Sequence, residues 1–250
     1  MKKTWPLIAL GIGAFLLLAL ITLPASAVLS YLSPAGLTLG GVSGSIWNGR
    51  AQAVRAGNLH LGSVEWDLDL LTLLTGRLGA DVKVARTDGF IQSTVTAAPS
   101  GALTFRNLNA SLPLGTLPAN VAPGGWTGTL NLKLPQLSLE NGWPVAATGA
   151  VELTDLLGPA RRPVALGSYK ITFPAEGAAA AGDSLTGALS DLGGPFAVNG
   201  TVQLKKERSY LVQGMIATRP GAPHDMSRSL EILGPADAQG RRPFTFEGTM

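Results

Sequence analysis

The chain has 250 residues, and its composition already narrows the class of protein. Charged residues make up 14% of it and hydrophobic residues 46%, which excludes an intrinsically disordered chain, because disorder requires low hydrophobicity and high net charge. The formal net charge is +3 and the basic residues are scattered, so they form no basic patch of the kind that binds nucleic acid. Since there are two histidines and no cysteine, disulfides, thiolate zinc sites, cysteine nucleophiles and multi-histidine metal centres are also excluded.

The N-terminus has the pattern of a membrane anchor. Lys2 and Lys3 precede an apolar run from Leu7 to Leu23, which would be about 25 Å long as a helix and reaches the ~30 Å of a hydrocarbon core with its flanks. The two lysines predict a cytoplasmic N-terminus. We therefore expect a single-pass inner-membrane protein with the following parts: cytoplasmic stub and transmembrane helix 1–29, linker 30–41, and periplasmic domain 42–250.

A cleaved signal peptide is the alternative interpretation of the same segment. Ala25-Ser26-Ala27 has the small-x-small form of a cleavage site, so the chain could be cut after Ala27. The apolar run is longer than an ordinary signal-peptide core, which favours the uncleaved anchor. Both interpretations export the rest of the chain.

Beyond the linker, apolar and polar residues alternate with a period of two, which is typical of strands with one buried face and one wet face. In Val64–Leu70 every second residue is apolar, and Asn141-Gly142 is one of several turn signals between such runs. Similar alternation marks residues 80–84, 130–134, 151–153, 169–173 and 196–204. The sequence predicts an all-β fold, a curled and mainly antiparallel β-sheet domain with one or two short helices.

Glycine recurs at the beginning of several of these strand patterns. Gly101, Gly128, Gly149 and Gly200 are each followed by alternating apolar residues, and a glycine there permits a bulge or a bend. Their intervals are unequal, so the chain is not a solenoid of fixed period. Helices are expected at 70–75, ending at Gly76, and at 226–233, capped by Asp225 and ending at Gly234.

The residues that carry chemistry are few and dispersed. His60 is expected on the wet face of a strand and His224 in a loop, and no nucleophile elbow accompanies them. Glu65, Asp67 and Asp69 would stand about 6.6 Å apart in succession, too far for a compact cation site without other ligands. We expect no enzyme activity, no cofactor and no metal. The tryptophans expected in the core are Trp47, Trp66, Trp126 and Trp143.

Several short motifs, in their order and spacing, resemble those of one family. Gly41 to Ala51 reads GVSGSIWNGRA, LGSVEW follows and ends at Trp66, LLTGRL includes Gly76, and DAQGR ends at Arg241. With one N-terminal membrane helix and this length, the chain resembles the type II secretion system N protein. The motif residues, taken as structural rather than catalytic, are Gly41, Gly44, Trp47, Gly49, Trp66, Leu73, Gly76, Gly234 and Gly240.

The resemblance implies an inner-membrane accessory or scaffold component of the type II secretion machinery. Its implied partners are the other inner-membrane platform proteins and the outer-membrane secretin, for protein export. The runner-up function is a periplasmic lipid-binding or lipid-conducting β-trough. It would apply if the apolar face of the curled sheet is incompletely covered, since the groove would then exceed the apolar patch of an ordinary soluble monomer.

Overall fold

The computed structural model describes residues 10–15, 18–19, 22–32, 37–57, 59–117, 124–159, 164–174 and 184–249. Residues 10–15 and 18–19 are helical, and helix α2 (Ala25–Leu32) follows them. Over these ranges no helix has both the length and the apolar character needed to cross a membrane. Lys2 and Lys3 lie outside the described residues, so the transmembrane anchor at 1–29 stays a prediction.

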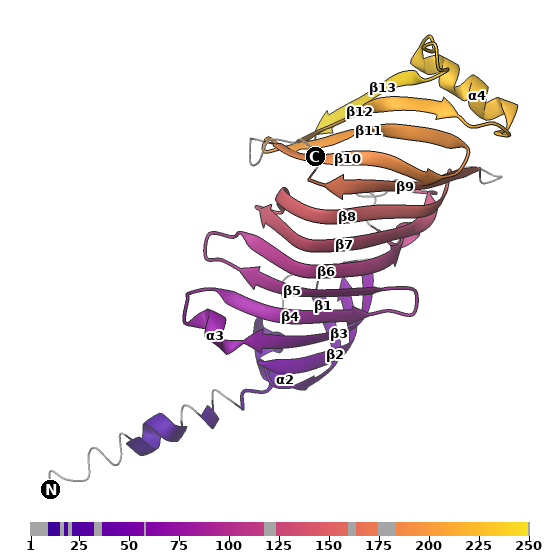
Figure 1. Ribbon diagram of the computed structural model, residues 1–250. Coiled ribbons are helices and arrows are strands. Elements are labelled where there is room, and N and C mark those ends of the chain that lie inside the picture. The colour runs from indigo at the N-terminus through magenta and orange to yellow at the C-terminus, as the bar shows by residue number, and fades with distance from the viewer. Residues whose placement is uncertain are drawn as a thin grey trace, which may run out of the picture. The chain divides into compact units, whose positions relative to one another are not determined.

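The chain forms two compact units, an N-terminal unit of residues 1–87 and a C-terminal unit of residues 88–250. The division after Thr87 falls inside the range 42–250, which the sequence treats as one domain. In both units the strands pair antiparallel with their neighbours in the chain, so the expected all-β, mainly antiparallel fold is confirmed (Figure 1).

In the N-terminal unit, strands β1 to β4 form an antiparallel meander. The elements are β1 (Leu37–Gly44), β2 (Asn48–Ala56), β3 (Leu59–Asp69), α3 (Leu70–Leu73) and β4 (Leu78–Ala85). Asp69 begins helix α3 by accepting a hydrogen bond from the Leu71 amide at 2.9 Å, and Gly76 ends the turn after it with φ +71°. The helix expected at 70–75 is therefore present in shorter form. Strand β1 begins at Leu37, inside the range expected as linker.

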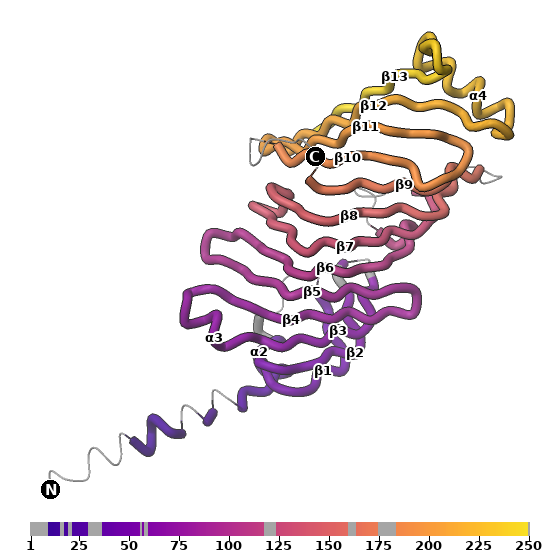
Figure 2. Tube along the Cα trace, viewed as in Figure 1, coloured from indigo at the N-terminus to yellow at the C-terminus, as the bar shows by residue number. Residues whose placement is uncertain are grey.

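The C-terminal unit is a longer antiparallel sheet whose strands bend along their length (Figure 2). Its strands are β5 (Phe90–Ala97), β6 (Leu103–Pro113), β7 (Thr127–Glu140), β8 (Trp143–Leu157), β9 (Ala165–Phe173), β10 (Ser184–Gly193), β11 (Phe196–Lys205), β12 (Ser209–Thr218) and β13 (Arg242–Thr249). Its helical turns are η1 (Leu114–Thr116), α4 (His224–Leu230) and η2 (Glu231–Leu233). Asn141 and Gly142 both have positive φ in the β7–β8 turn, as a two-residue hairpin of this twist requires.

Glycines coincide with irregularities in this sheet, as expected from their pattern. Gly149 has φ +115° and lies beside a register shift of the β7–β8 pair, where an added Cβ would meet the Lys133 carbonyl oxygen at 2.2 Å. A second shift separates Asp191 from Gly193 in the β9–β10 pair. These bulges lie within the strands as well as at their beginnings. They bend the strands and increase the local twist.

The core of the C-terminal unit is thin. One cluster joins Phe196, Val198, Phe244 and Met226 of α4, and another joins Ala147, Phe173 and Leu185. Among the described residues, no large side chain is less than 2% exposed. In the part of the chain that the structure describes, the large apolar side chains of the sheet therefore stay partly accessible to solvent.

The C-terminal helix corrects two expectations. Asp225 does not cap it, because α4 begins at His224 after Pro223, and no side chain caps its first amides. Asp225 lies in the first turn instead, 3.9 Å from Arg228, where its charge favours the helix N-terminus. His224, expected in a loop, is the first helical residue. The helical stretch then continues as η2 and ends at Gly234, which has φ +99°.

Candidate functional site: an apolar groove

One face of the C-terminal unit carries an apolar row that crosses every strand from β5 to β13. Residues directly opposite one another in antiparallel strands point to the same face, so the register defines this row. The row consists of Ile91, Ala110, Leu132, Val151, Ile171, Leu189, Gly200, Gly214 and Phe244. Such a row cannot be seen in any single strand, because it requires the pairing of all of them.

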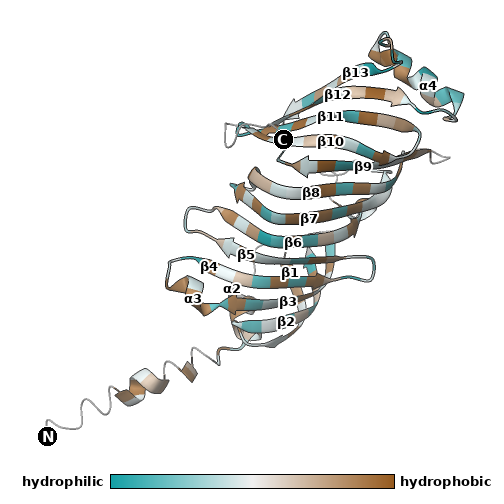
Figure 3. Ribbon diagram, viewed as in Figure 1, coloured by the Kyte–Doolittle hydropathy of each residue, from teal (hydrophilic) through white to brown (hydrophobic). Residues whose placement is uncertain are grey.

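The neighbouring row, displaced by one residue, faces the other side and is mostly polar. It consists of Ser111, Asn131, Glu152, Lys170, Ser190, Asn199 and Met215. Within it the Ser111 hydroxyl donates to Asn131 Oδ1 at 2.8 Å, and Lys170 pairs with Glu152 at 3.1 Å. The sheet is therefore two-faced, as the alternating brown and teal bands along its strands show (Figure 3).

An open groove of about 650 Å³ lies on the apolar face. Strands β7 to β13 provide most of its wall, and the 3₁₀ turn η2 provides Ile232 and Leu233. The side chains that line it include Leu130, Val151, Leu153, Tyr169, Ile171, Leu189, Val198, Val212, Ile216 and Phe246. All of these except Val198 and Phe246 are half-buried, so their apolar atoms remain accessible.

A pair of facing glycines belongs to the apolar row but does not line the groove. Gly200 of β11 is opposite Gly214 of β12. A Cβ added at Gly214 would lie 2.2 Å from the Asn199 carbonyl oxygen and 2.7 Å from Gly200 Cα, so the two backbones approach too closely for a side chain. The glycines interrupt the row of bulky side chains between Leu189 and Phe244.

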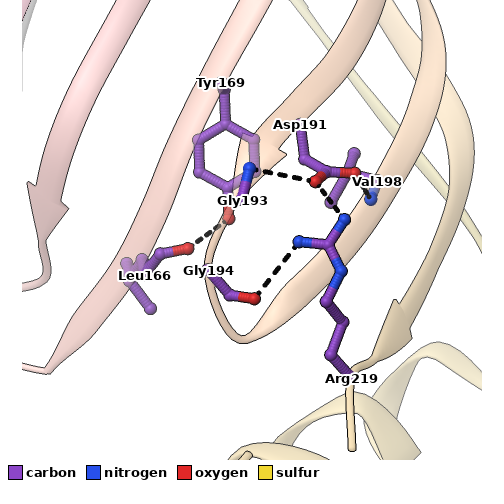
Figure 4. Close-up of polar contacts among 7 residues, drawn as sticks. All are labelled: Leu166, Tyr169, Asp191, Gly193, Gly194, Val198 and Arg219. Carbon is purple, nitrogen blue, oxygen red and sulfur yellow. Dashed lines mark hydrogen bonds and ion pairs between the residues drawn. The ribbon is translucent and has the colours of Figure 1, made fainter.

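An ion pair between Asp191 and Arg219, here called the polar clip, connects strand ends in the same sheet as the groove. Asp191 pairs with Arg219 at 2.5 Å and accepts hydrogen bonds from the amides of Gly193 at 3.2 Å and Val198 at 2.9 Å (Figure 4). Arg219 also donates to the Gly194 carbonyl at 3.3 Å. The clip therefore joins the β10–β11 turn to the end of β12.

Burial and hydrogen bonds act in opposite directions on the clip carboxyl. Burial of Asp191 disfavours its charge, but the Val198 amide and Arg219 outweigh that and hold the pKa of Asp191 below its usual value. Tyr169 lines the groove nearby and donates to the Leu166 carbonyl at 2.6 Å. Burial, and then the charge of Asp191, raise the pKa of Tyr169. The phenol is thus a neutral donor at neutral pH. The polar groups of Tyr169, Asp191 and Arg219 are paired with one another or with backbone groups of the same sheet.

None of the family-motif residues is among those that line this groove; they form turns and close contacts. Gly41, Gly44, Gly76, Gly234 and Gly240 all have positive φ, which explains glycine at each position. The stretch from Asp237 to Arg241 is a tight loop in which the Asp237 carboxylate accepts from the Arg241 amide at 2.8 Å and the Gln239 amide at 2.9 Å.

Gly49, Trp66 and Leu73 belong to the N-terminal unit. Gly49 faces Trp66 in the β2–β3 register, and the indole N–H donates to the Ile46 carbonyl at 3.0 Å. Leu73 is exposed on α3. Trp47 and Trp66, which the sequence predicts to be largely buried, are half-buried. Trp126 and Trp143, expected in the core, are half-buried as well.

The candidates for chemistry stay dispersed in the structure. His60 is exposed on β3 and accepts from Arg55 Nε at 2.6 Å, while Glu65 pairs with Arg50 and Asp69 caps α3. The described ranges contain no group of three acidic or histidine side chains placed to hold a metal ion. The candidate site is therefore the groove, and its chemistry is apolar contact.

Sequence reasoning did not assign any groove residue. Each lining side chain belongs to an alternating pattern, but alternation does not reveal which strands are adjacent or in what register. The clip between Asp191 and Arg219 has no sequence signal, because the two residues are far apart in the chain and meet through the β11–β12 pairing.

The fold and the groove define the class of this protein: an antiparallel β-sheet protein with one open apolar face. Residues 35–245 match the family model described as "Type II secretion system (T2SS), protein N". The chain therefore belongs to the protein N family of the type II secretion system and is a component of type II secretion.

Individual relatives agree with this family. The type II secretion system protein N of Aeromonas hydrophila is 27% identical over 257 residues, covering 99% of both chains. That of Vibrio cholerae serotype O1 is 28% identical over 261 residues, covering 97% of this chain and 99% of the relative. That of Aeromonas salmonicida is 40% identical over 45 residues, 18% of this chain and 96% of the relative. No solved structure matches the chain.

Proposed function

We propose that this protein is an inner-membrane accessory component that serves as a scaffold of the type II secretion machinery. In this proposal residues 1–29 anchor it, the N-terminus is cytoplasmic, and the rest is periplasmic and docks on the platform proteins and the outer-membrane secretin. The single observation that carries the proposal is the family match over residues 35–245. The two lysines before an apolar run support the topology.

Deletion in the native host tests the scaffold function. Export of type II substrates should fall, and folded substrate should accumulate in the periplasm. Affinity purification of the full chain from cross-linked cells should recover platform proteins and secretin. Unchanged export in an assay that detects partial defects would contradict the proposal.

Fusions of a periplasm-dependent reporter test the topology separately. Reporters placed after Leu32 and after Met250 should both be active if the two sites are periplasmic. A mature N-terminus at Val28, found by mass spectrometry, would replace the anchor with a cleaved signal peptide.

The groove favours a second candidate function, the binding of lipid acyl chains. Its lining consists almost entirely of aliphatic and aromatic side chains, and the backbone polar groups of strands β8 to β12 are used in sheet pairing. Such a wall offers apolar contact without hydrogen bonds, and each buried CH₂ contributes about 0.8 kcal/mol. An acyl chain meets that chemistry without leaving an unpaired polar group.

Photo-cross-linking distinguishes the two functions. Full-length protein in membranes that contain a phospholipid with a photoactivatable acyl chain should be labelled on β8 to β12 if the groove holds lipid. Leu153 lines the groove, so Leu153→Gln should lower that labelling, whereas Glu152→Gln on the opposite face should not. Both variants must keep the wild-type melting temperature in lipid-free detergent. Labelling confined to residues 1–29 would exclude the lipid function.

A further inference from the structure

The outer edge of β13 is an open sheet edge in the C-terminal unit. β13 pairs with β12 along residues 242–249, and no described strand of residues 88–250 pairs with its other side. Figure 1 shows β13 as the outermost strand of that unit. An unpaired edge presents a row of N–H and C=O groups that can pair with another strand.

The groove continues to this edge without closing. Phe246 of β13 lines the groove and is 58% exposed, and Ile232 of η2 also lines it and is 88% exposed. Thr245 and Glu247 between and beside the phenylalanines are exposed as well. The edge therefore combines free backbone groups with uncovered apolar side chains.

We propose that the β13 edge pairs antiparallel with the β13 edge of a second copy of this chain, centred on Thr245. The proposal is independent of the lipid and scaffold functions. It rests on the sequence Phe244-Thr245-Phe246, which is symmetric about its central residue. In an antiparallel pair about a two-fold axis at Thr245, each phenylalanine faces a phenylalanine of the other copy, so this segment is self-complementary.

Pro243 fixes which residues of β13 can pair outward. Proline has no N–H, so in a sheet it lies on an edge strand with its nitrogen on the solvent side. Backbone groups alternate in direction along a strand, so Thr245 and Glu247, two and four residues after Pro243, also direct their N–H and C=O groups away from β12. The two-fold axis of a symmetric pair can lie at one of these residues or at one of the residues between them, Phe244 or Phe246.

Thr245 is the favoured centre. A centre at Phe244 or Phe246 would place only one phenylalanine opposite a phenylalanine, and the other opposite Arg242 or Gly248. A pair centred on Pro243 would have no amide donor at its centre, and one centred on Glu247 would place two carboxylates opposite each other, which is destabilising. In a pair centred on Thr245, Glu247 of one copy faces Pro243 of the other, and Arg242 faces Gly248. No like charges are opposed in this register.

The Thr245 register also joins the apolar faces of the two copies. Phe244 of each copy faces Phe246 of the other, on the groove side of both sheets, and the two rings of one copy are already 5.8 Å apart. Cross-strand aromatic pairs of this kind stabilise a sheet. The two grooves would then form one continuous apolar surface across the two-fold axis.

Cysteine cross-linking of the full-length protein tests the register, because the chain has no cysteine of its own. Thr245→Cys places two thiols at a directly opposed pair, about 5.5 Å apart at Cα and within disulfide range. Glu247→Cys is the matched control, since its two copies would be about 14 Å apart along the strands. We expect an intermolecular disulfide in most of the Thr245→Cys protein and little in the control.

The outcomes decide the proposal. Equal cross-linking of the two variants, absence of cross-linking in both, or a Thr245→Cys adduct with a different protein would overturn it. As a second measurement, light scattering of the wild-type protein in detergent should give a dimer. Thr245→Pro should halve the measured molecular mass. Its melting temperature should match that of the wild-type protein diluted to the monomer, because the outward N–H does not bond to β12. A wild-type monomer at micromolar concentration would also overturn the self-pairing.

Discussion

Gly49→Ala should destabilise the N-terminal unit through a single steric contact. A Cβ at position 49 would lie 2.4 Å from Trp66 Cζ2 and 2.8 Å from both Trp66 Cε2 and the Ser45 carbonyl oxygen. Distances below 3.0 Å require a neighbour to move, and two of these contacts come from a ring held by its hydrogen bond to Ile46. The indole must therefore rotate out or the β2–β3 pair must separate.

The expected cost follows from what the indole would lose. Overpacking of this kind costs about 1 to 3 kcal/mol, and loss of the hydrogen bond to Ile46 adds about 1 kcal/mol. Because Trp66 is half-buried and can move partly into solvent, we expect a total of about 2 kcal/mol. Urea unfolding of the full-length protein, followed by circular dichroism, measures it.

Two further variants isolate the contact. Gly40→Ala is the matched control in the same unit, since a Cβ there meets Ala53 Cβ at an ordinary 3.5 Å, and it should change the free energy of unfolding by less than about 0.5 kcal/mol. In a Trp66→Leu background, Gly49→Ala should cost less than in the wild type, because the clashing ring is absent. An equal cost in both backgrounds would refute the steric explanation.

Three other substitutions test separate parts of the structure. Trp66→Ala should cost about 2 to 3 kcal/mol, less than the 3 to 5 kcal/mol of a fully buried tryptophan, and wild-type stability with lost partner binding would place Trp66 at an interface. Gly214→Ala should cost at least about 1 to 3 kcal/mol in thermal unfolding, because its Cβ would meet Asn199 backbone at 2.2 Å, whereas Gly158→Ala meets Leu166 at 3.5 Å and should be neutral. Because the pKa of Asp191 is lowered in the folded state, its ionised carboxylate stabilises that state at pH values above the unfolded pKa, and this stabilisation is lost as the pH falls through the folded pKa. Asp191→Asn should therefore flatten the decrease in melting temperature below about pH 4, and an unchanged decrease would contradict this.

The sequence predicts the strands well because alternation is a local property. The pattern at 196–204 corresponds to β11, and that at 169–173 falls within β9. Capping and turn chemistry are equally local, as Asp69 and the Asn141-Gly142 turn show. Where the local signals compete, the prediction fails: Pro223 begins α4 before Asp225 can cap it.

The groove could not be predicted because it is a property of the register. Leu189 lies beside Ile171 and Gly200 because β10 pairs with β9 and β11, and the bulge between Asp191 and Gly193 shifts one of these pairs. A slip of one residue in any pair would exchange the apolar row for the polar one. The degree of burial of Trp66 could not be predicted from the sequence either, since it depends on how closely Gly49 approaches the indole.

The open face has an energetic consequence for whatever covers it. Half-buried Leu153, Ile171 and Leu189 leave apolar area in water. In the proposed lipid function a bound acyl chain would remove that area from water, and this would add hydrophobic stabilisation to the sheet. A ligand that binds the folded state alone raises stability by RT ln(1 + [L]/Kd), about 2.7 kcal/mol at a hundredfold excess over Kd. Self-pairing of β13 would also stabilise the folded state against unfolding, because the second copy would cover Phe246, which is exposed in the single chain. If both occur, lipid occupancy and dimerisation should therefore each raise the melting temperature, and Leu153→Gln should remove the first increment while Thr245→Pro removes the second.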